Sequence, residues 1–457
     1  MQPIASSYRD PSGFVFKNGG QFYRYIAPQY LDNYGMLMGG GLYKALTDVN
    51  RLVKHEEIKD TAPLGTMPDP RGKIILPEQI PFISYPYEWC FDMWRDAAIV
   101  TLKIASASLE KGMMLKDATP YNIQFNIGRP VFIDTLSFER YADGSPWVAY
   151  RQFCECFLGP LLLMHYGHRD AGKLFLSYPD GIPVEMIRSL LPKKAKWNMH
   201  VYLNIFLQAK IASDPKKAEE KNKPLSRAKL EILLKGLTGF IEKLKPKASE
   251  SEWDNYYAET ILGNEYLGAK TAIIKRFTDD LSFRTMIDLG ANDGFFSLLL
   301  KDKAGYIVAT DADSNCINTM YREVRKQKIK NVLPLVSMLN NPSPATGWAN
   351  AERASLTERL QAELVLALAL VHHLAISSNL PLTGIAARFA EMCSWLIIEF
   401  VPRTDEKVQQ LLKGRRDDFP DYTEENFRTA FGEYFTVIKK GKAGNTDRVI
   451  FLMKRKV

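Results

Sequence analysis

The chain has 457 residues, of which 46% are hydrophobic and 25% are charged. This composition is typical of a folded protein with two or three domains, and it excludes a chain that is disordered throughout. The net charge of +8 is small for this length, and many lysines and arginines lie in polar stretches, so we do not expect nucleic-acid binding. No apolar run approaches the ~18 residues that a membrane span needs.

The cysteines and the N-terminus indicate the cellular compartment. Five cysteines include Cys154 and Cys156, which are separated by one residue, but their spacing fits neither a zinc site nor a complete set of disulfides. Residues 1–14 lack the basic start and apolar core of a secretory signal. We therefore expect a protein of the reducing cytoplasm.

Residues 1–211 are predicted to form an α+β domain. Residues 87–109 have helical periodicity, and residues 115–125 and 130–135 flank a turn at 126–129 that is typical of a hairpin. The apolar stretches 147–153 and 157–163 are expected in the core or at a domain interface, and a homo-oligomer contact is the alternative.

Asp117 is followed by Asn122, and twelve residues later by Asp134 after an apolar strand. This pattern resembles the catalytic loop and metal-binding aspartate of protein kinases and aminoglycoside phosphotransferases. The resemblance implies that Asp117 orients a hydroxyl, while Asn122 and Asp134 hold Mg²⁺ for Mg-ATP. Leu115 stands where those families usually have histidine, no glycine-rich loop precedes it, and Lys54 is a weak candidate for the phosphate-binding lysine. A kinase-like fold with and without phosphotransfer therefore both stay open.

Residues 212–226 are rich in charge and poor in apolar side chains, so we predict a surface linker there. Residues 227–244 and 253–277 have the periodicity of amphipathic helices. The range 227–280 is therefore predicted as a helical lead-in, which partly forms a lid over the domain that follows.

Residues 281–457 alternate between strands and helices, which predicts a parallel sheet with helices on both faces. The last two strands are joined by a short loop without a crossover helix, so they must pair antiparallel. Five parallel strands followed by such a hairpin are typical of the Rossmann-like, seven-stranded sheet of class I methyltransferases. The predicted strands are 285–289, 306–310, 332–336, 364–369, 395–400, 435–439 and 448–453.

A glycine turn joins the first of these strands to a helix. Gly290 and Gly294 bracket the turn, where glycine permits positive φ and lets a ligand lie against the main chain. The dinucleotide fingerprint has three glycines in a different spacing, because a pyrophosphate must approach closely. The pattern therefore favours S-adenosylmethionine over NAD, with Asp288 or Asp293 near the amino-acid end of the cofactor.

The second strand ends at Asp311 and Asp313, where a carboxylate can accept hydrogen bonds from both ribose hydroxyls. A turn or a helix cap is the alternative role for an aspartate after a strand. The candidate cofactor-binding residues are Asp288, Gly290, Asn292, Asp293, Gly294, Phe295, Asp311, Asp313, Ser337 and Met338.

The fourth and fifth strands lead to the candidate catalytic residues His372, His373 and Glu399. The carboxyl ends of parallel strands line the ligand crevice, so these side chains are expected near the transferred methyl group. A neutral imidazole can take the proton from an attacking hydroxyl or amine. The alternatives are a helix cap or core packing for either histidine, and an ion pair with Arg403 for Glu399. We predict no metal in this domain.

Several motifs along the whole chain resemble a bacterial family of class I methyltransferases related to the nodulation protein NoeA. The resemblance implies a methyltransferase with an attached N-terminal domain, without a defined substrate. Relatives tend to carry an acidic residue near Met338 that holds the adenine amine, and Ser337 or Asn340 is expected to take over that role here. The motifs span 83–89, 115–118, 132–138, 146–153, 288–292, 341–344, 368–374 and 398–402.

Together these patterns predict methyl transfer from S-adenosylmethionine to a small molecule, such as a sugar or another polar metabolite. The alternative is a kinase-like phosphotransferase that uses Mg-ATP, or a pseudokinase, with a regulatory methyltransferase-like domain.

Overall fold

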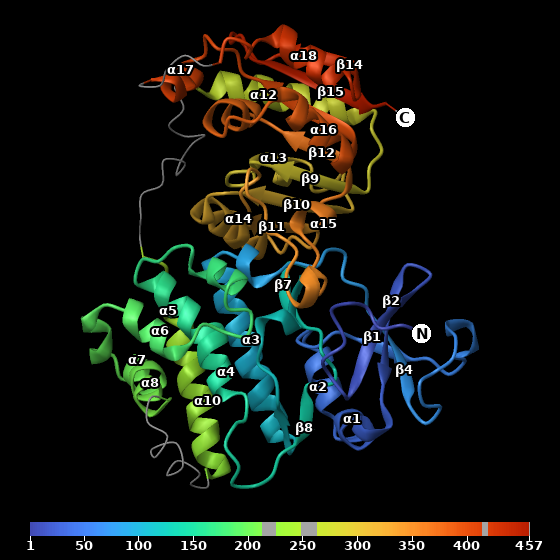
Figure 1. The fold of residues 1–457 in the computed structure, drawn as a ribbon, viewed down its shortest axis with the longest axis vertical. Coiled ribbons are helices and arrows are strands. Elements are labelled where there is room, and N and C mark those ends of the chain that lie inside the picture. The colour runs from blue at the N-terminus through green and yellow to red at the C-terminus, as the bar shows by residue number, and fades with distance from the viewer. Residues whose placement is uncertain (213–224, 248–262, 414–418, 457) are drawn as a thin grey trace. The chain divides into compact units, whose positions relative to one another are not determined.

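The computed structural model describes residues 1–212, 225–247, 263–413 and 419–456 (Figure 1). It forms two compact units. The N-terminal unit comprises Met1–Ala248 with Ala345–Ala354, and the C-terminal unit comprises Ser249–Pro344 with Ser355–Val457. The predicted linker lies almost wholly outside the described residues, as do residues 253–262 of the second predicted lead-in helix. The predicted lead-in contributes α10 (Arg227–Glu242) to the N-terminal unit and α12 (Gly263–Asp279) to the C-terminal unit.

The N-terminal unit is α+β, as the sequence predicts. An antiparallel four-stranded sheet has the order β1-β2-β4-β3, and two smaller sheets pair β5 with β8 and β6 with β7. The strands are β1 (Gly13–Asn18), β2 (Gln21–Ile26), β3 (His55–Glu57), β4 (Lys73–Pro77), β5 (Met113–Leu115), β6 (Ile123–Asn126), β7 (Arg129–Phe132) and β8 (Phe138–Arg140). The helices outside the lead-in are α1 (Leu31–Gly39), α2 (Leu42–Thr47), α3 (Phe91–Glu110), α4 (Tyr150–Phe153), α5 (Gly159–His165), α6 (Val184–Leu190), α7 (Met199–Val201) and α8 (Leu207–Ala212).

The long helix α3 forms the centre of this unit. Its apolar side chains recur at helical spacing, and Met93, Trp94 and Ala97 are fully buried. The helix begins at Phe91, because Trp89 and Cys90, after the 3₁₀ turn Pro86–Glu88, have extended backbones. Helix α10 packs along α3.

The predicted hairpin is confirmed as β6 and β7. Ile127 and Gly128 form its two-residue loop, with φ of 53° and 66°, which matches the twist of the paired strands. The apolar stretch after α4 continues through a π-helical turn, η5 (Cys154–Leu158), into α5. Phe153, Phe157 and Leu161 are fully buried there, so the stretch belongs to the core of the N-terminal unit.

The C-terminal unit contains a seven-stranded sheet of order β11-β10-β9-β12-β13-β15-β14. The first five strands in this order are parallel, and β15 lies antiparallel to β13 and β14 on either side. This order confirms the predicted methyltransferase-like sheet. The strands are β9 (Thr285–Leu289), β10 (Tyr306–Asp311), β11 (Val332–Val336), β12 (Ala362–Ala367), β13 (Cys393–Phe400), β14 (Phe435–Lys442) and β15 (Val449–Arg455).

Helices α14, α16 and α18 pack around the strands, together with α12 (Figure 1). Strands whose two faces are covered are continuous apolar runs, and all five residues of the edge strand β11 are buried. None of the described helices is long and apolar enough to cross a membrane. The remaining helical segments are α13 (Phe295–Leu299), α14 (Ser314–Lys326), α15 (Leu356–Arg359), α16 (Leu382–Met392), α17 (Glu406–Leu412), α18 (Glu424–Gly432) and the π-helical η10 (His373–Ser377).

Candidate functional site

The turn between β9 and α13 has the positive backbone φ angles that its glycines predict. Gly290 and Gly294 have φ of 71° and 89°, and Asn292 between them has φ of 52°. The amides of Gly290 and Ala291 both donate to the Thr310 carbonyl, which holds the turn against the end of β10. A Cβ on Gly294 would lie 2.6 Å from Met320 Cγ, so the close approach of α14 also requires glycine there.

Asp311, at the end of β10, holds this turn in place. One carboxylate oxygen accepts from the amide of Asn292 at 2.9 Å, and the other accepts from the amide of Asp313 at 2.8 Å. Burial raises the pKa of Asp311 above its usual value. Asp313 accepts from the amide of Asn315 and caps α14, which is the alternative role that the sequence left open for it.

A cavity of about 290 Å³ opens at the carboxyl ends of β9, β10, β11 and β12. Parallel α/β sheets bind ligands at this edge. The lining combines carboxylates, hydroxyls, an imidazole and aliphatic side chains. It consists of Gly290, Asn292, Asp311, Ala312, Asp313, Ser337, Met338, Leu339, Asn340, Leu368, Ala369, Leu370, His373, Leu374, Ser377 and Ser378.

Six of the ten predicted cofactor-binding residues line this cavity, and Asp288, Asp293, Gly294 and Phe295 do not. Asp288 lies within the core, where its carboxylate accepts from the Ser297 hydroxyl at 2.7 Å and burial raises its pKa to about 6. Burial also raises the pKa of Asp293.

Ser337 is the unsatisfied polar group of the cavity. Its amide donates to the Asp311 carbonyl at 2.8 Å, but the buried hydroxyl has no hydrogen-bond partner among the described residues. Buried polar groups normally find a partner, and an orphaned one at a cavity wall points to a ligand. Asn340 also lines the cavity and donates to the Ser378 hydroxyl at 3.0 Å, whereas the Met338 side chain has no polar atom to offer an amine.

The two predicted histidines have different surroundings. His373 lines the cavity, and burial lowers its pKa to about 4, so its ring is neutral at neutral pH. His372 is 2% exposed, packs against His373 with 4.2 Å between ring centroids, and does not line the cavity. The core-packing alternative therefore describes His372.

Glu399 is fully buried in an ion-pair network and does not line the cofactor cavity. Its carboxylate accepts from the Lys270 ammonium at 2.7 Å and from the Tyr266 hydroxyl at 2.6 Å. Burial raises the pKa of Glu399, but Lys270 and Arg448 outweigh this and hold it below its usual value. Arg448 in turn donates to Asp405 at 2.7 and 2.9 Å. The sequence suggested Arg403 as the partner, and the structure shows that Lys270 pairs with Glu399.

In the N-terminal unit, the three predicted phosphotransfer residues lie in the stretch of chain that joins β5 to β8, and they come together in space. Asn122 and Gln152 donate to opposite oxygens of Asp117, at 3.2 and 2.7 Å. Burial raises the pKa of Asp117, and the nearby carboxylate of Asp134 adds to this effect.

Asp134 accepts from the Arg24 guanidinium, from the Ser137 hydroxyl and from the Leu136 amide. Burial raises the pKa of Asp134, but Arg24 outweighs it and lowers the pKa. Lys54 is exposed, and Arg24 on β2 supplies the cation at this cluster. Among the described residues, no group of three or more histidine, cysteine, aspartate or glutamate side chains is arranged to hold a metal ion.

Sequence reasoning missed several residues of these sites. Leu368, Leu370 and Ser377 line the cavity because they follow β12 at the edge of the sheet where the cavity opens. Ala369 has φ of 51° in this segment. Arg24 and Lys270 meet their carboxylate partners 110 and 129 residues away in the chain. No local signal marks contacts at such separations.

The chain is similar over nearly its whole length to one curated protein. It is 33% identical over 464 residues to the nodulation protein NoeA of Rhizobium meliloti (strain 1021), and the alignment covers 99% of this chain and 96% of NoeA. No protein-family model matches the chain.

Solved structures with a partial likeness include two methyltransferases. The N-methyltransferase NodS of Bradyrhizobium japonicum WM9 has 11% identity and a TM-score of 0.32, covering 43% of this chain and all of NodS. A SAM-dependent methyltransferase from Aquifex aeolicus has 16% identity and a TM-score of 0.31, covering 45% of this chain and all of that enzyme. These values are low, so the fold assignment rests on the strand order.

Proposed function

The chain belongs to the family of the nodulation protein NoeA, and within this family we propose that it is an S-adenosylmethionine-dependent methyltransferase that acts on a small polar molecule. The observation that carries the proposal is the cavity at the strand ends, where the half-buried Asp311 carboxylate and the unpartnered Ser337 hydroxyl lie beside aliphatic side chains. Such a combination suits a nucleoside, which offers two ribose hydroxyls, one aromatic amine and two apolar ring faces.

The cavity residues fit the parts of this cofactor. The Asp311 carboxylate would accept from the ribose hydroxyls, as the sequence proposes for an aspartate at this strand end. The Ser337 hydroxyl would accept from the adenine amine, and Leu368 and Leu370 would pack against the adenine ring. When bound, S-adenosylmethionine supplies a methyl group on a sulfonium, whose carbon–sulfur bond breaks as the acceptor attacks.

His373 is the proposed proton acceptor for the attacking atom. Its ring is neutral at working pH because burial lowers its pKa to about 4, and it lines the cavity beside Leu370 and Leu374. A hydroxyl or amine loses a proton when it forms a bond to carbon, and the neutral His373 imidazole can accept that proton. Because burial lowers its pKa and disfavours the imidazolium, His373 would pass the proton on to solvent. A His373→Gln variant should bind the cofactor normally and lose roughly 10²–10⁴-fold in kcat.

Calorimetric titration with S-adenosylhomocysteine tests the proposal directly. One-to-one binding that is lost in Asp311→Ala would support it, and turnover would then be sought with radiolabelled S-adenosylmethionine and pools of polar metabolites. If the wild-type protein binds neither S-adenosylmethionine nor S-adenosylhomocysteine, the proposal is wrong. A matched Asp302→Ala variant, in an exposed loop of the same unit, should bind normally.

A second function is favoured by one observation in the N-terminal unit. Asp117, Asn122 and Asp134 lie at the same site, as a kinase-like active site requires. We therefore keep Mg-ATP-dependent phosphotransfer, or a pseudokinase role, as the second proposal. ATP binding that requires Mg²⁺ and disappears in Asp134→Ala would support it, while no ATP binding at millimolar concentration would exclude it.

The compartment proposed for this protein is the cytoplasm. The five cysteines are buried and no disulfide joins any two of them, which supports a reducing environment.

A further inference from the structure

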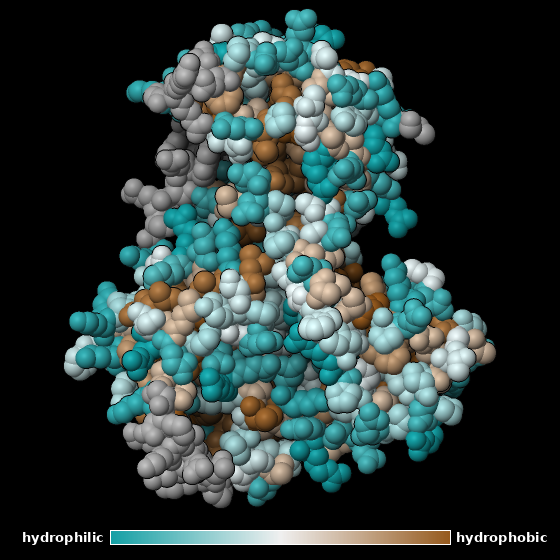
Figure 2. Space-filling model, in the orientation of Figure 1, coloured by the Kyte–Doolittle hydropathy of each residue, from teal (hydrophilic) through white to brown (hydrophobic). Residues whose placement is uncertain are grey.

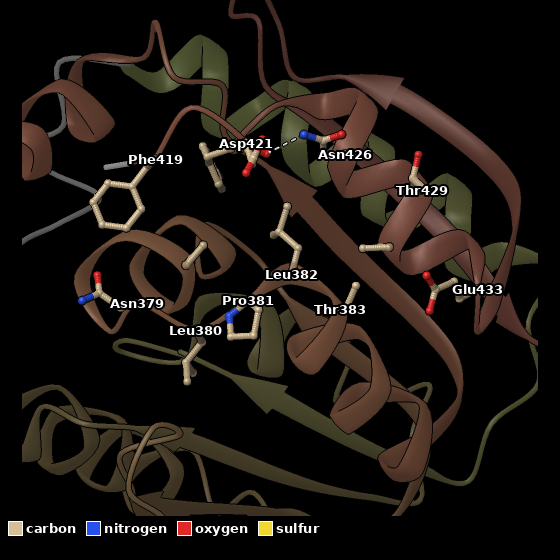
Figure 3. A pocket seen from close by; sticks show the side chains of 13 residues that line it. Asn379, Leu380, Pro381, Leu382, Thr383, Phe419, Asp421, Asn426, Thr429 and Glu433 are labelled. Atoms are coloured by element: carbon tan, nitrogen blue, oxygen red, sulfur yellow. Dashed lines mark hydrogen bonds between the residues drawn. The ribbon is translucent and has the colours of Figure 1, made fainter. Parts of the chain in front are cut away.

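A cavity of about 680 Å³ lies between α16 and α18 of the C-terminal unit (Figure 3). In its wall, the Asn426 side-chain amide donates to the backbone carbonyl of Asp421 at 3.0 Å. The two acidic side chains of the lining, Asp421 and Glu433, are exposed to solvent. We assign no ligand to this cavity.

The segment 188–210 of the N-terminal unit exposes large apolar side chains to solvent. Trp197 is 82% exposed and Met199 is 74% exposed, while Tyr202 and Leu203 are both 45% exposed. Single exposed apolar residues are common, but a group of them in one place marks a surface that binds a partner. These four residues are named the apolar patch.

The backbone brings three residues of the apolar patch onto one face of a helix. Helix α7 continues through a π-helical turn into α8 without a break. Met199, Tyr202 and Leu203 stand at positions i, i+3 and i+4 of this helix, so their side chains are neighbours. Ile205 and Ala209 are fully buried and attach the other side of the helix to the core. The exposed face is therefore apolar, where a helix on a protein surface normally carries polar side chains.

The apolar patch stands on a rigid support. The Asn198 side chain accepts from the His200 amide at 3.0 Å and caps α7. The His200 ring stacks on Phe240 of α10, with 4.7 Å between ring centroids. The Tyr150 hydroxyl donates to the Asn204 side chain at 2.6 Å. These contacts hold the helix in one position, so little backbone ordering opposes binding.

Cations surround the apolar patch. Lys193, Lys194 and Lys196 lie on the 3₁₀ turn that precedes α7, and all three are exposed. The Lys196 ammonium lies 5.4 Å from the centroid of the Trp197 ring. Residues 186–212 contain four lysines and one arginine, but no aspartate or glutamate. The partner of this surface is therefore expected to carry negative charge.

Aromatic, aliphatic and cationic side chains in this arrangement fit the surface of an anionic membrane. Tryptophan and tyrosine rings are favoured at the boundary between headgroups and acyl chains, and lysines are attracted to anionic headgroups. Methionine and leucine side chains can enter the edge of the acyl region. A nucleic acid would gain less from them, because bases stack on aromatic faces.

We propose that the apolar patch and its three neighbouring lysines form a membrane-binding surface, which docks the protein on bilayers that contain anionic lipids. Trp197 and Met199 would enter the headgroup region, while Lys193, Lys194 and Lys196 would pair with lipid phosphates. This binding goes beyond methyl transfer and does not depend on it.

Vesicle binding by the full chain tests the inference. One set of vesicles is pure phosphatidylcholine, and the other contains equal parts of phosphatidylcholine and phosphatidylglycerol. Cosedimentation should show at least about tenfold tighter binding to the anionic vesicles, and this binding should weaken as salt is added. Tryptophan emission should shift to shorter wavelength on binding, because Trp197 leaves water.

A lysine variant locates the cationic part of the surface. Lys193→Gln, Lys194→Gln and Lys196→Gln in one chain should weaken binding to the anionic vesicles about 100-fold. A matched control has the same net charge but changes three exposed lysines elsewhere in the same unit: Lys17→Gln, Lys44→Gln and Lys59→Gln. The control should bind nearly as well as the wild type.

Tryptophan variants locate the apolar part. Trp197→Ala should weaken binding about tenfold, because it removes the largest side chain of the apolar patch. Trp197→Phe keeps an apolar ring, so it should retain most of the affinity and lose the emission shift. The control is Trp348→Ala, which removes a 75% exposed tryptophan of the same unit and should bind as wild type. All these side chains are exposed, so the melting temperatures should match that of the wild type.

Several outcomes would overturn the inference. One is no binding to the anionic vesicles, and another is equal binding to the anionic and neutral vesicles. Equal losses in the two lysine variants would assign the attraction to net charge and not to this surface. A single-stranded oligonucleotide is the last probe. If it binds through the same residues while vesicles do not bind, the partner is a nucleic acid. None of these measurements uses S-adenosylhomocysteine, so the proposed methyltransferase function stands or fails separately.

Discussion

The polar cluster of the N-terminal unit and the cofactor cavity of the C-terminal unit both contain carboxylates that accept hydrogen bonds from the protein, and they differ in one hydroxyl of the cavity. Asp117 and Asp134 have protein donors on their carboxylates, from Asn122, Gln152 and Arg24. In the cavity, the Ser337 hydroxyl is buried without a partner among the described residues. A satisfied cluster stabilises the fold, whereas an open polar atom at a cavity wall needs a ligand.

The surfaces of the two units can be compared in Figure 2, where brown apolar side chains are exposed in a band on the visible face of the C-terminal unit. Exposed apolar surface beside polar groups is typical of a binding region. We therefore expect the N-terminal cluster to contribute to stability and the C-terminal cavity to bind a ligand, with phosphotransfer at the N-terminal cluster as the second proposal, and each variant below tests one side of this comparison.

The largest effect is expected from Gly290→Val. The side chain would have to adopt φ of 71°, its Cβ would lie 3.3 Å from Leu370, and the added methyl groups would fill the cavity. We expect affinity for S-adenosylhomocysteine to fall more than ~100-fold in calorimetry. Gly268→Val on α12, where nothing lies near a Cβ, should bind normally. Retained binding in the first variant would place the cofactor elsewhere.

Arg24→Met tests the structural role of the N-terminal cluster. The variant leaves the Asp134 carboxylate, whose side chain is 14% exposed, without its cation. The free energy of unfolding in urea should fall by about 3 kcal/mol, while cofactor affinity stays unchanged. The control is Arg71→Met, which breaks an exposed pair with Asp69 and should leave the free energy of unfolding nearly unchanged. If Arg24→Met and Arg71→Met change the free energy of unfolding equally, the Asp134 carboxylate does not depend on Arg24 and is available to a ligand such as Mg²⁺.

Asp311→Asn should weaken cofactor binding about tenfold at neutral pH. The ionised carboxylate is the form that accepts from ribose hydroxyls, and burial raises its pKa, so wild-type affinity should fall as the pH drops through that raised pKa. The variant cannot titrate and should show a flatter profile. Calorimetry between neutral and acidic pH measures the cofactor affinity of the wild type and of the variant. If the two affinities fall in parallel, the pH dependence belongs to another group.

The smallest effect is expected from Ser337→Ala, which removes the unpartnered hydroxyl. Affinity for S-adenosylhomocysteine should fall about threefold to tenfold, the value of one hydrogen bond. S-inosylhomocysteine lacks the adenine amine, so its affinity should not change. A loss for both ligands would show that the hydroxyl shapes the cavity without recognising the amine.

Much of the fold could be predicted because its signals are local. The runs 285–289 and 332–336 are strands with the predicted bounds, since a strand covered on both faces is a continuous apolar run. Gly290 and Gly294 mark a turn that only positive φ can make. The loop 443–448 is too short for a crossover, which forces the antiparallel pairing of β14 and β15.

The roles of individual side chains could not be predicted in the same way. His372 and His373 are neighbours in the chain, yet one lies in the core and the other lines the cavity, and the packing after β12 decides between them. Glu399 ends a strand at the ligand-binding edge, yet Lys270 on a distant helix takes its carboxylate.

The sequence by itself therefore determined the strands and their class of sheet, the glycine turn and the class of cofactor proposed for it, because neighbouring residues dictate the hydrophobic period and the backbone conformation. Only the tertiary structure decided that Asp311 lines the cavity while Asp288 is buried in the core. Whether a polar side chain meets a ligand or a protein partner depends on contacts between residues far apart in the chain, and no local pattern encodes those contacts.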